Sequence, residues 1–364
     1  MTVFALSRAP TRPLAPGDRS HLARLTIAAL GVLLVAAMAM SLFTGASGVS
    51  ALDAARLWLG IAHPDDPAVA RAGIILNDIR LPRMVLGVLV GAGLAVSGVV
   101  MQGMFRNPLA DPGLVGVSAG AGLGAVLFIV LGGTVLAPIT MHLGIYAVPL
   151  AAFAGGALTT IVLYRVSTAR GQTAIATMLL AGIAIGALAG AVTGMLVYVA
   201  NDTQLRDLTF WGLGSLAGAN WTKVLAGGPL MAGGVLVSLT IWRGLNALTL
   251  GESAAHHMGV DVQRLKTIAI CAVAACVGAA VAVSGGIGFV GIVVPHLLRI
   301  LIGPDHRYLL AASALLGASF LLVADAVSRV IVAPAELPIG IVTATVGGPF
   351  FLYILLRRRN ELAW

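Results

Sequence analysis

Long apolar runs recur along the whole chain, separated by short polar stretches. A helix needs about 20 mostly apolar residues to cross a bilayer, whereas a transmembrane β-barrel shows short alternating segments instead. The pattern therefore predicts an all-α polytopic membrane protein with ten transmembrane helices. The expected segments are residues 25–43, 84–101, 114–131, 145–163, 174–199, 222–242, 266–283, 287–302, 309–332 and 338–356. The eighth segment is the weakest, because it is short and holds Pro295, His296 and Arg299.

Composition supports this class. Of the 364 residues, 59% are hydrophobic and only 10% are charged, whereas a soluble domain carries about 25% charged residues. The mean hydropathy is +1.00. The net charge of +8 comes from 22 Lys and Arg against 14 Asp and Glu. No basic run is interleaved with aromatic residues, as a nucleic-acid groove would require, so the excess charge indicates membrane orientation and no nucleic-acid partner.

The basic residues also predict the orientation. With a cytoplasmic N-terminus, 15 of the 22 basic residues fall on the inside, as the positive-inside rule requires. We expect both termini in the cytoplasm, as tails of residues 1–24 and 357–364 around one membrane domain of residues 25–356. A cleaved signal peptide is the alternative for the first segment. However, 25–43 is longer than the usual apolar signal core, and cleavage would leave an odd number of spans.

Three loops are long enough to fold. Residues 44–83 and 200–221 are expected outside, and the second of these can form a short helix. Residues 243–265 are the largest inside loop and contain a stretch typical of a short amphipathic helix.

Glycines form stripes with a four-residue spacing. One stripe lies in the fifth segment (Gly182, Gly186, Gly190 and Gly194), and another lies in the third (Gly116, Gly120 and Gly124). Small residues at this spacing let helix backbones approach closely. Tight helix packing is one interpretation, and a smooth wall facing a translocation path is the other.

Enzymatic motifs are absent from the sequence. It holds no HExxH or CxxC motif and no nucleophile elbow in a suitable context. A P-loop needs Gly-Lys-Ser/Thr, and neither Lys223 nor Lys266 follows a glycine. The chain is therefore predicted to be no enzyme and to bind no cofactor or metal of its own. If ATP and magnesium drive it, another subunit must bind them.

Few charges lie within the apolar segments. Asp325 and Arg329 are four residues apart near the outer end of the ninth segment, and we expect them to pair on one helix face. This scarcity disfavours an ion-coupled transporter, which usually needs a chain of ionisable groups. His296 can ligate a metal or haem, but a lone histidine is more often packed or hydrogen-bonded.

Several stretches together resemble the FecCD family of permeases from ATP-binding-cassette (ABC) importers. They are residues 79–126, 250–266, 285–310 and 324–359, including the run LGESAAHHMGV. The family imports iron-siderophores, haem and cobalamin, and has ten helices per subunit in the type II ABC importer permease fold. The resemblance implies a homodimer in the bacterial inner membrane. It also implies two cytoplasmic ATPase subunits and a periplasmic binding protein as partners.

The resemblance also assigns roles by position. The stretch at about 250–262 matches the cytoplasmic coupling helix, which contacts the ATPase. Arg80, Arg83 and Arg329 match positions that dock acidic residues of the binding protein, as arginine pairs readily with carboxylates. Snorkelling arginines at helix ends are the structural alternative. The expected ATPase contacts are Glu252, Ala254, His256, His257, Met258 and Gly259.

The translocation path is matched more weakly. Asn107 and Leu109, in the run NPLADP, resemble the inner gate together with Ile175 and Ala176. Some family members carry small hydroxyl residues where this chain has Ile and Ala, so an apolar constriction is expected. The glycine stripe of the fifth segment is assigned to the same path.

The substrate assignment rests on residues 202–221, which resemble the haem-importing branch most. Arg206 can meet a haem propionate, and Phe210 and Trp211 can meet the porphyrin face, unless they only pack the short outer helix. We therefore predict a permease for haemin. A ferric-siderophore or cobalamin permease is the alternative in the same family, and an ion-coupled transporter is the alternative from another class.

Overall fold

The computed structural model describes residues 19–44, 56, 59–60, 67–169, 172–333 and 335–358. The first 18 residues and residues 359–364 lie outside this range, and so do most of the predicted terminal tails. Helices make up almost all of the described chain. They are α1 (Ser20–Phe43), α3 (Pro67–Ile74), α4 (Leu81–Phe105), α5 (Val117–Leu131), α6 (Ala137–Leu143), α7 (Ala147–Ser167), α8 (Ile175–Val199), α9 (Asp202–Gly212), α10 (Trp221–Thr240), α11 (Trp242–Thr249), α12 (Glu252–His257), α13 (Val262–Ser284), α14 (Val290–Ile302), α15 (His306–Val330) and α16 (Ile339–Arg358).

Shorter elements join some of these helices. A π-helical turn, η1 (Ile75–Arg80), joins α3 to α4, and the 3-10 turns η2 (Pro112–Val115) and η3 (Gly144–Tyr146) precede α5 and α7. The β-structure of the described residues is one antiparallel hairpin of β1 (Thr168–Ala169) and β2 (Gln172–Thr173). The all-α prediction is confirmed.

Among the described residues, seven helices are long and apolar enough to span a membrane, by length and composition. Three shorter apolar helices, Val117–Leu131, Val290–Ile302 and Ile339–Tyr353, occupy the places of the third, eighth and tenth predicted segments. The ten expected apolar segments are therefore all helical, while the count of ten full spans stays a prediction.

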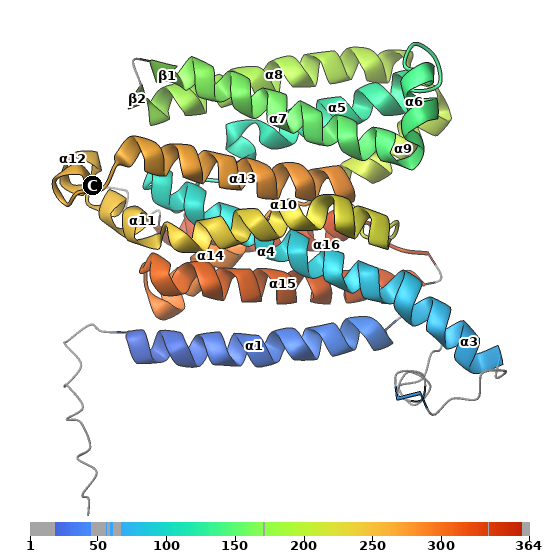
Figure 1. Ribbon diagram of the computed structural model, residues 1–364, viewed down its shortest axis with the longest axis horizontal. Helices are drawn as coiled ribbons and strands as arrows, with labels where there is room; N and C mark the ends of the chain where they lie inside the picture. Colours follow the sequence, from blue (N-terminus) through green and yellow to red (C-terminus); the bar gives the residue numbers. More distant parts are fainter. Residues whose placement is uncertain are drawn as a thin grey trace, which may run out of the picture.

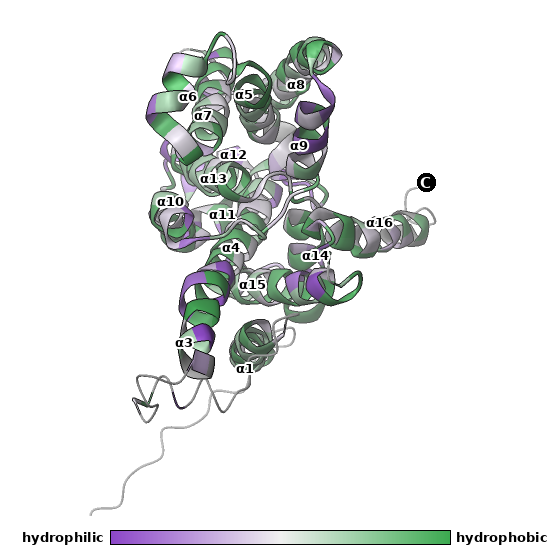
Figure 2. Ribbon diagram, turned by 90° about the vertical axis from the view of Figure 1, so that its right-hand side faces the viewer, coloured by the Kyte–Doolittle hydropathy of each residue, from purple (hydrophilic) through white to green (hydrophobic). Residues whose placement is uncertain are grey.

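Helix α4 is the centre of the bundle. It contacts α15, α13, α10 and α14, and 78% of its most apolar stretch is buried. Figure 1 shows α5, α7 and α8 as a layer on one side of this centre and α14, α15 and α1 on the other. Figure 2 shows α16 projecting from one side of the bundle. This arrangement leaves α1 and α8 with only 17% of their apolar stretches buried.

Two expected boundaries are wrong. The loop predicted at 44–83 is helical from Pro67 onward, because α3 and η1 continue directly into α4. The coupling helix expected at about 250–262 is only six residues long, Glu252–His257. Gly251 and Gly259 adopt positive φ angles of 108° and 82°, a conformation that ends a helix and that glycine adopts at little cost. The chain therefore turns sharply on both sides of α12.

The two ends of the bundle carry different features. The start of α1, the β1–β2 hairpin, α11 and α12 lie at one end in Figure 1, and α3, α6 and α9 lie at the other. This arrangement places the predicted ATPase contacts and the start of α8 at the same end of the molecule.

Candidate functional site

The segment Glu252–Gly259, here called the α12 segment, presents most of its surface to solvent. Ala255 is fully buried and anchors it, and Ala254 is half-buried. The other predicted ATPase contacts are exposed, with Met258 at 53%. They are Glu252, His256, His257, Met258 and Gly259. A short rigid helix with an exposed outer face is a surface that a partner subunit can bind.

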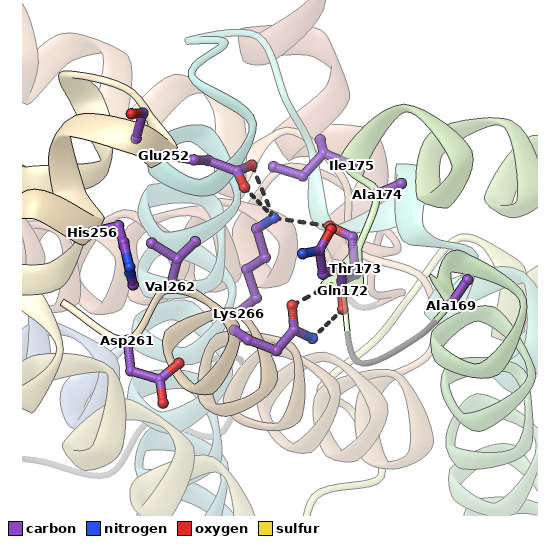
Figure 3. A pocket seen from close by; sticks show the side chains of 12 residues that line it. Ala169, Gln172, Thr173, Ala174, Ile175, Glu252, His256, Asp261, Val262 and Lys266 are labelled. Atoms are coloured by element: carbon purple, nitrogen blue, oxygen red, sulfur yellow. Dashed lines mark hydrogen bonds and ion pairs between the residues drawn. The ribbon is translucent and has the colours of Figure 1, made fainter.

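A cavity of about 930 Å³ separates the α12 segment from the β1–β2 hairpin. Figure 3 shows Lys266 extending across this cavity between Glu252 and Thr173. Lys266 Nζ lies 2.8 Å from Glu252 Oε1 and donates to the Thr173 carbonyl oxygen over 2.8 Å. Gln263 accepts from the Thr173 backbone N–H at 2.9 Å and donates to the Thr173 hydroxyl at 2.6 Å. The start of α13 therefore binds both sides of the cavity.

Five charged side chains form a cluster near the opposite end, here called the arginine cluster: Arg80, Arg83, Arg329, Asp325 and Glu336. Asp325 is fully buried and accepts from Arg83 Nε and Nη2 over 3.0 and 2.9 Å. Arg329 Nη2 lies 3.0 Å from Asp325 Oδ2, so the expected i,i+4 pair is confirmed. Arg83 Nη1 also binds Glu336 Oε1 over 2.9 Å.

The surroundings of the three arginines differ from the expected exposed docking patch. Arg80, Arg83 and Arg329 are only 4%, 6% and 7% exposed. Arg80 donates to the Leu42 carbonyl oxygen over 2.6 Å, and Arg329 donates to that of Thr44 over 2.7 Å. These bonds join the end of α1 to η1 and α15, a structural role that the sequence does not reveal because the partners are far apart along the chain.

The predicted gate residues lie around two tight turns. Leu109 N donates to Asn107 Oδ1 over 2.9 Å, and Gly113 N donates to Asp111 Oδ1 over 2.7 Å. Burial raises the pKa of Asp111, and this hydrogen bond opposes the shift. The η2 turn that follows contacts α8, whose first residues are Ile175 and Ala176. Their side chains add no hydroxyl group, as the sequence indicates.

The two glycine stripes have different surroundings. A Cβ at Gly120 or Gly124 would overlap the backbone of α7, at Gly155 or Ala151. The α5 stripe is therefore a tight helix contact. In the α8 stripe, Gly182 is buried, whereas a Cβ at Gly190 or Gly194 would have no atom within 4 Å among the described residues. Packing within one subunit does not explain the outer part of the α8 stripe.

The candidate substrate residues divide into two groups. Helix α9 begins with a capping box between Asn201 and Gln204. Arg206 and Phe210 are exposed and four residues apart, so they share a face of α9. Trp211 instead packs against the main hydrophobic core, as the alternative interpretation expects.

His296 is 5% exposed and meets Phe350 edge-on, with ring centroids 6.1 Å apart. The described residues hold no cluster of three metal-ligating side chains.

Sequence reasoning missed Thr173, Gln263 and Glu336, and it gave Lys266 only a topological role. A signal was available for Lys266, which is one of two lysines in a chain whose other basic residues are all arginines. An ammonium is a compact charge with three donors, which suits a buried site with several acceptors.

The match to a family model decides the classification. The model of the FecCD transport family matches residues 33–357. The chain belongs to the FecCD transport family. It is 45% identical to the hemin transport system permease protein HmuU of Yersinia pestis over 91% of this chain and 96% of that protein.

Cobalamin permeases are similarly related. The cobalamin import system permease protein BtuC of Halobacterium salinarum is 46% identical over 79% of this chain and 74% of that protein. The vitamin B12 import system permease protein BtuC of Escherichia coli is 39% identical over 91% and 94%. A solved metal-chelate type ABC transporter in an inward-facing conformation is also similar. It has a TM-score of 0.78 and 32% identity over 92% of this chain and 99% of that chain.

The chain is thus a multi-pass membrane protein and the permease of a FecCD-family ABC importer. Its relatives are transport subunits and not enzymes.

Proposed function

We propose that the chain translocates haemin across the bacterial inner membrane. The observation that carries the proposal is the 45% identity, over nearly the full length, to a hemin permease. The exposed face of α9 with Arg206 and Phe210 supports it, because a guanidinium suits a propionate and a phenyl ring suits a porphyrin face. Cobalamin is the second candidate, favoured by relatives of 46% and 39% identity, and a ferric siderophore is the third.

The proposed importer contains two copies of this permease, two cytoplasmic ATPase subunits and a periplasmic binding protein. ATP and magnesium bind the ATPases. The α12 segment docks on the ATPase, and both termini of the permease face the cytoplasm. The projection of α16 from the bundle (Figure 2) supports a second permease copy on that side. Alternating access then results from ATPase closure moving the α12 segments as rigid bodies.

Uptake into liposomes tests the substrate. We expect ATP-dependent accumulation of haemin by the complex with ATPase and binding protein, and much less of vitamin B12 or a ferric siderophore. The permease alone should accumulate none. A preference for vitamin B12 would replace haemin with the second candidate, and uptake without the ATPase would contradict the ABC mechanism.

Docking of the binding protein is expected to depend on Arg80. The arginine cluster holds three guanidinium groups and two carboxylates, so it keeps one net positive charge for an acidic partner. Arg80→Glu reverses that sign and should weaken binding about tenfold at low salt, with a smaller effect at high salt. Binding can be measured on immobilised permease across a salt series.

Arg71→Glu is the control for the change in net charge, and the melting temperature of Arg80→Glu is the control for folding, because Arg80 is buried and bonded to Leu42. Arg71 is exposed on α3 near the same end, outside the cluster, so it changes the net charge equally. A larger loss of binding from Arg71→Glu than from Arg80→Glu would contradict the assigned role of Arg80.

A further inference from the structure

Lys266 joins two parts of the chain that have separate predicted roles. Its ammonium reaches Glu252, the first residue of α12, and the carbonyl of Thr173, two residues before α8. The first contact lies in the predicted ATPase-binding segment, and the second lies beside the predicted gate at Ile175 and Ala176. Figure 3 shows both contacts meeting at one nitrogen.

The ammonium is the buried end of this ion pair, whereas the Glu252 side chain is 45% exposed. Lys266 is only 3% exposed, and its Nζ lies 2.8 Å from one Glu252 carboxylate oxygen and 2.9 Å from the other. A buried ammonium without its partners loses the interactions that offset its desolvation. A displacement of Glu252 away from Lys266 is therefore costly, and movement of the α12 segment tends to carry Lys266 and its other partner with it.

The Thr173 side of the bridge is also rigid. Gln263, one helical turn before Lys266, binds both the backbone N–H and the hydroxyl of Thr173. The Thr173 hydroxyl also lies 2.8 Å from that of Thr168 across the hairpin, and Ala174 N donates to Ser167 O over 2.9 Å. These bonds fix Thr173 within the hairpin. Because α8 begins two residues later, at Ile175, a movement of Thr173 is expected to move the start of α8 with it.

We propose that Lys266 is the positioning residue that makes the α12 segment and the start of α8 move as one unit during the ATP cycle. Gln263 holds the hairpin side of the same unit. The inference deepens the proposed function, on which it rests, because it assumes that α12 binds the ATPase. It also says how movement of α12 reaches the predicted gate: the Lys266 ammonium binds both the Glu252 carboxylate and the Thr173 carbonyl oxygen.

The test replaces Lys266 with methionine, which keeps the apolar stem and removes the charge and the donors. Spin labels on cysteines introduced at Ala169 and Ser253, which are both exposed, report the distance between the hairpin and α12. Cys271 and Cys276 are replaced by alanine so that only the introduced cysteines are labelled. In the wild-type complex we expect the same distance without nucleotide and with ATP and vanadate. In Lys266→Met we expect the distance to change or broaden with ATP.

Coupling provides the second readout. We expect Lys266→Met to increase the ATP hydrolysed per haemin imported at least tenfold, and Lys266→Arg to restore the ratio at least in part. A purely structural role would lower hydrolysis and uptake together and leave that ratio unchanged. Gln263→Ala, which removes only the hairpin bonds, is the second variant if Lys266→Met does not fold, and we expect it to uncouple in the same direction.

Arg264→Met is the matched control, because Arg264 lies two residues before Lys266 on α13, carries the same charge and is exposed. An unchanged inter-label distance and an unchanged coupling ratio in Lys266→Met would overturn the inference. An effect of Arg264→Met as large as that of Lys266→Met would also overturn it. Failure of the wild-type complex to use ATP for uptake would instead contradict the proposed function itself.

Discussion

Replacing Asp325 with asparagine is expected to destabilise the protein by about 3–5 kcal/mol, the cost of removing one partner from a buried ion pair. Asp325 is fully buried and pairs with Arg83 and Arg329 at 2.9 and 3.0 Å. Asparagine keeps the size of the side chain but removes its charge, so two buried guanidinium groups lose the carboxylate that both of them bind. Glu336 remains bonded to Arg83, but its side chain is 39% exposed.

Thermal unfolding of the purified permease in detergent measures this effect. We expect the melting temperature to fall by about 4–7 °C in Asp325→Asn. Asp207→Asn is the matched control on exposed α9, where a surface change should stay within about 0.5 kcal/mol. Equal melting temperatures for the two variants would show that the arginine cluster does not stabilise the fold.

The apolar pattern predicts the helices well because the bilayer imposes a simple rule. Every backbone group must be bonded within the lipid, so a long apolar run has to be helical. The run at 174–199 corresponds to α8, Ile175–Val199. The boundaries fail where polar residues are helical too: Asn77, Asp78 and Arg80 belong to η1, which continues into α4.

Long-range partners are the part that the sequence does not reveal. The pair Asp325 and Arg329 is predictable because one helix turn brings them together, and the structure has it. Arg83 and Asp325 lie on different helices, 242 residues apart in the chain. The contact between Lys266 and Thr173 spans 93 residues. The first depends on how α4 packs against α15 and the second on how α13 packs against α7 and the β1–β2 hairpin, which hydropathy does not determine.

The glycine stripes show the same limit. Both have the four-residue spacing that permits close helix contact, and only tertiary structure separates them. Gly120 and Gly124 lie against the α7 backbone, whereas Gly190 and Gly194 face open space within the described subunit. The same substitution of glycine by valine is therefore expected to have different effects in α5 and in α8.

Gly124→Val is expected to destabilise the permease by about 1–3 kcal/mol or more, through overpacking. Its Cβ would overlap the Ala151 carbonyl oxygen and lie 2.7 Å from the carbonyl carbon. Because these atoms belong to the α7 backbone, no side-chain rotation relieves the clash. The helices α5 and α7 must separate, and the melting temperature should fall together with haemin uptake.

Gly194→Val is expected to differ from Gly124→Val in its effect on the melting temperature. Both substitutions place valine inside a membrane helix, so their intrinsic effects on the helix are matched, and only their surroundings differ. Because a Cβ at Gly194 meets no described atom within 4 Å, the melting temperature should remain near that of the wild type. Uptake into liposomes should still decrease, since added bulk narrows the predicted path. A stable Gly194→Val variant with full uptake would show that the α8 glycine stripe does not line the translocation path. A stable Gly124→Val variant would contradict the close contact between α5 and α7.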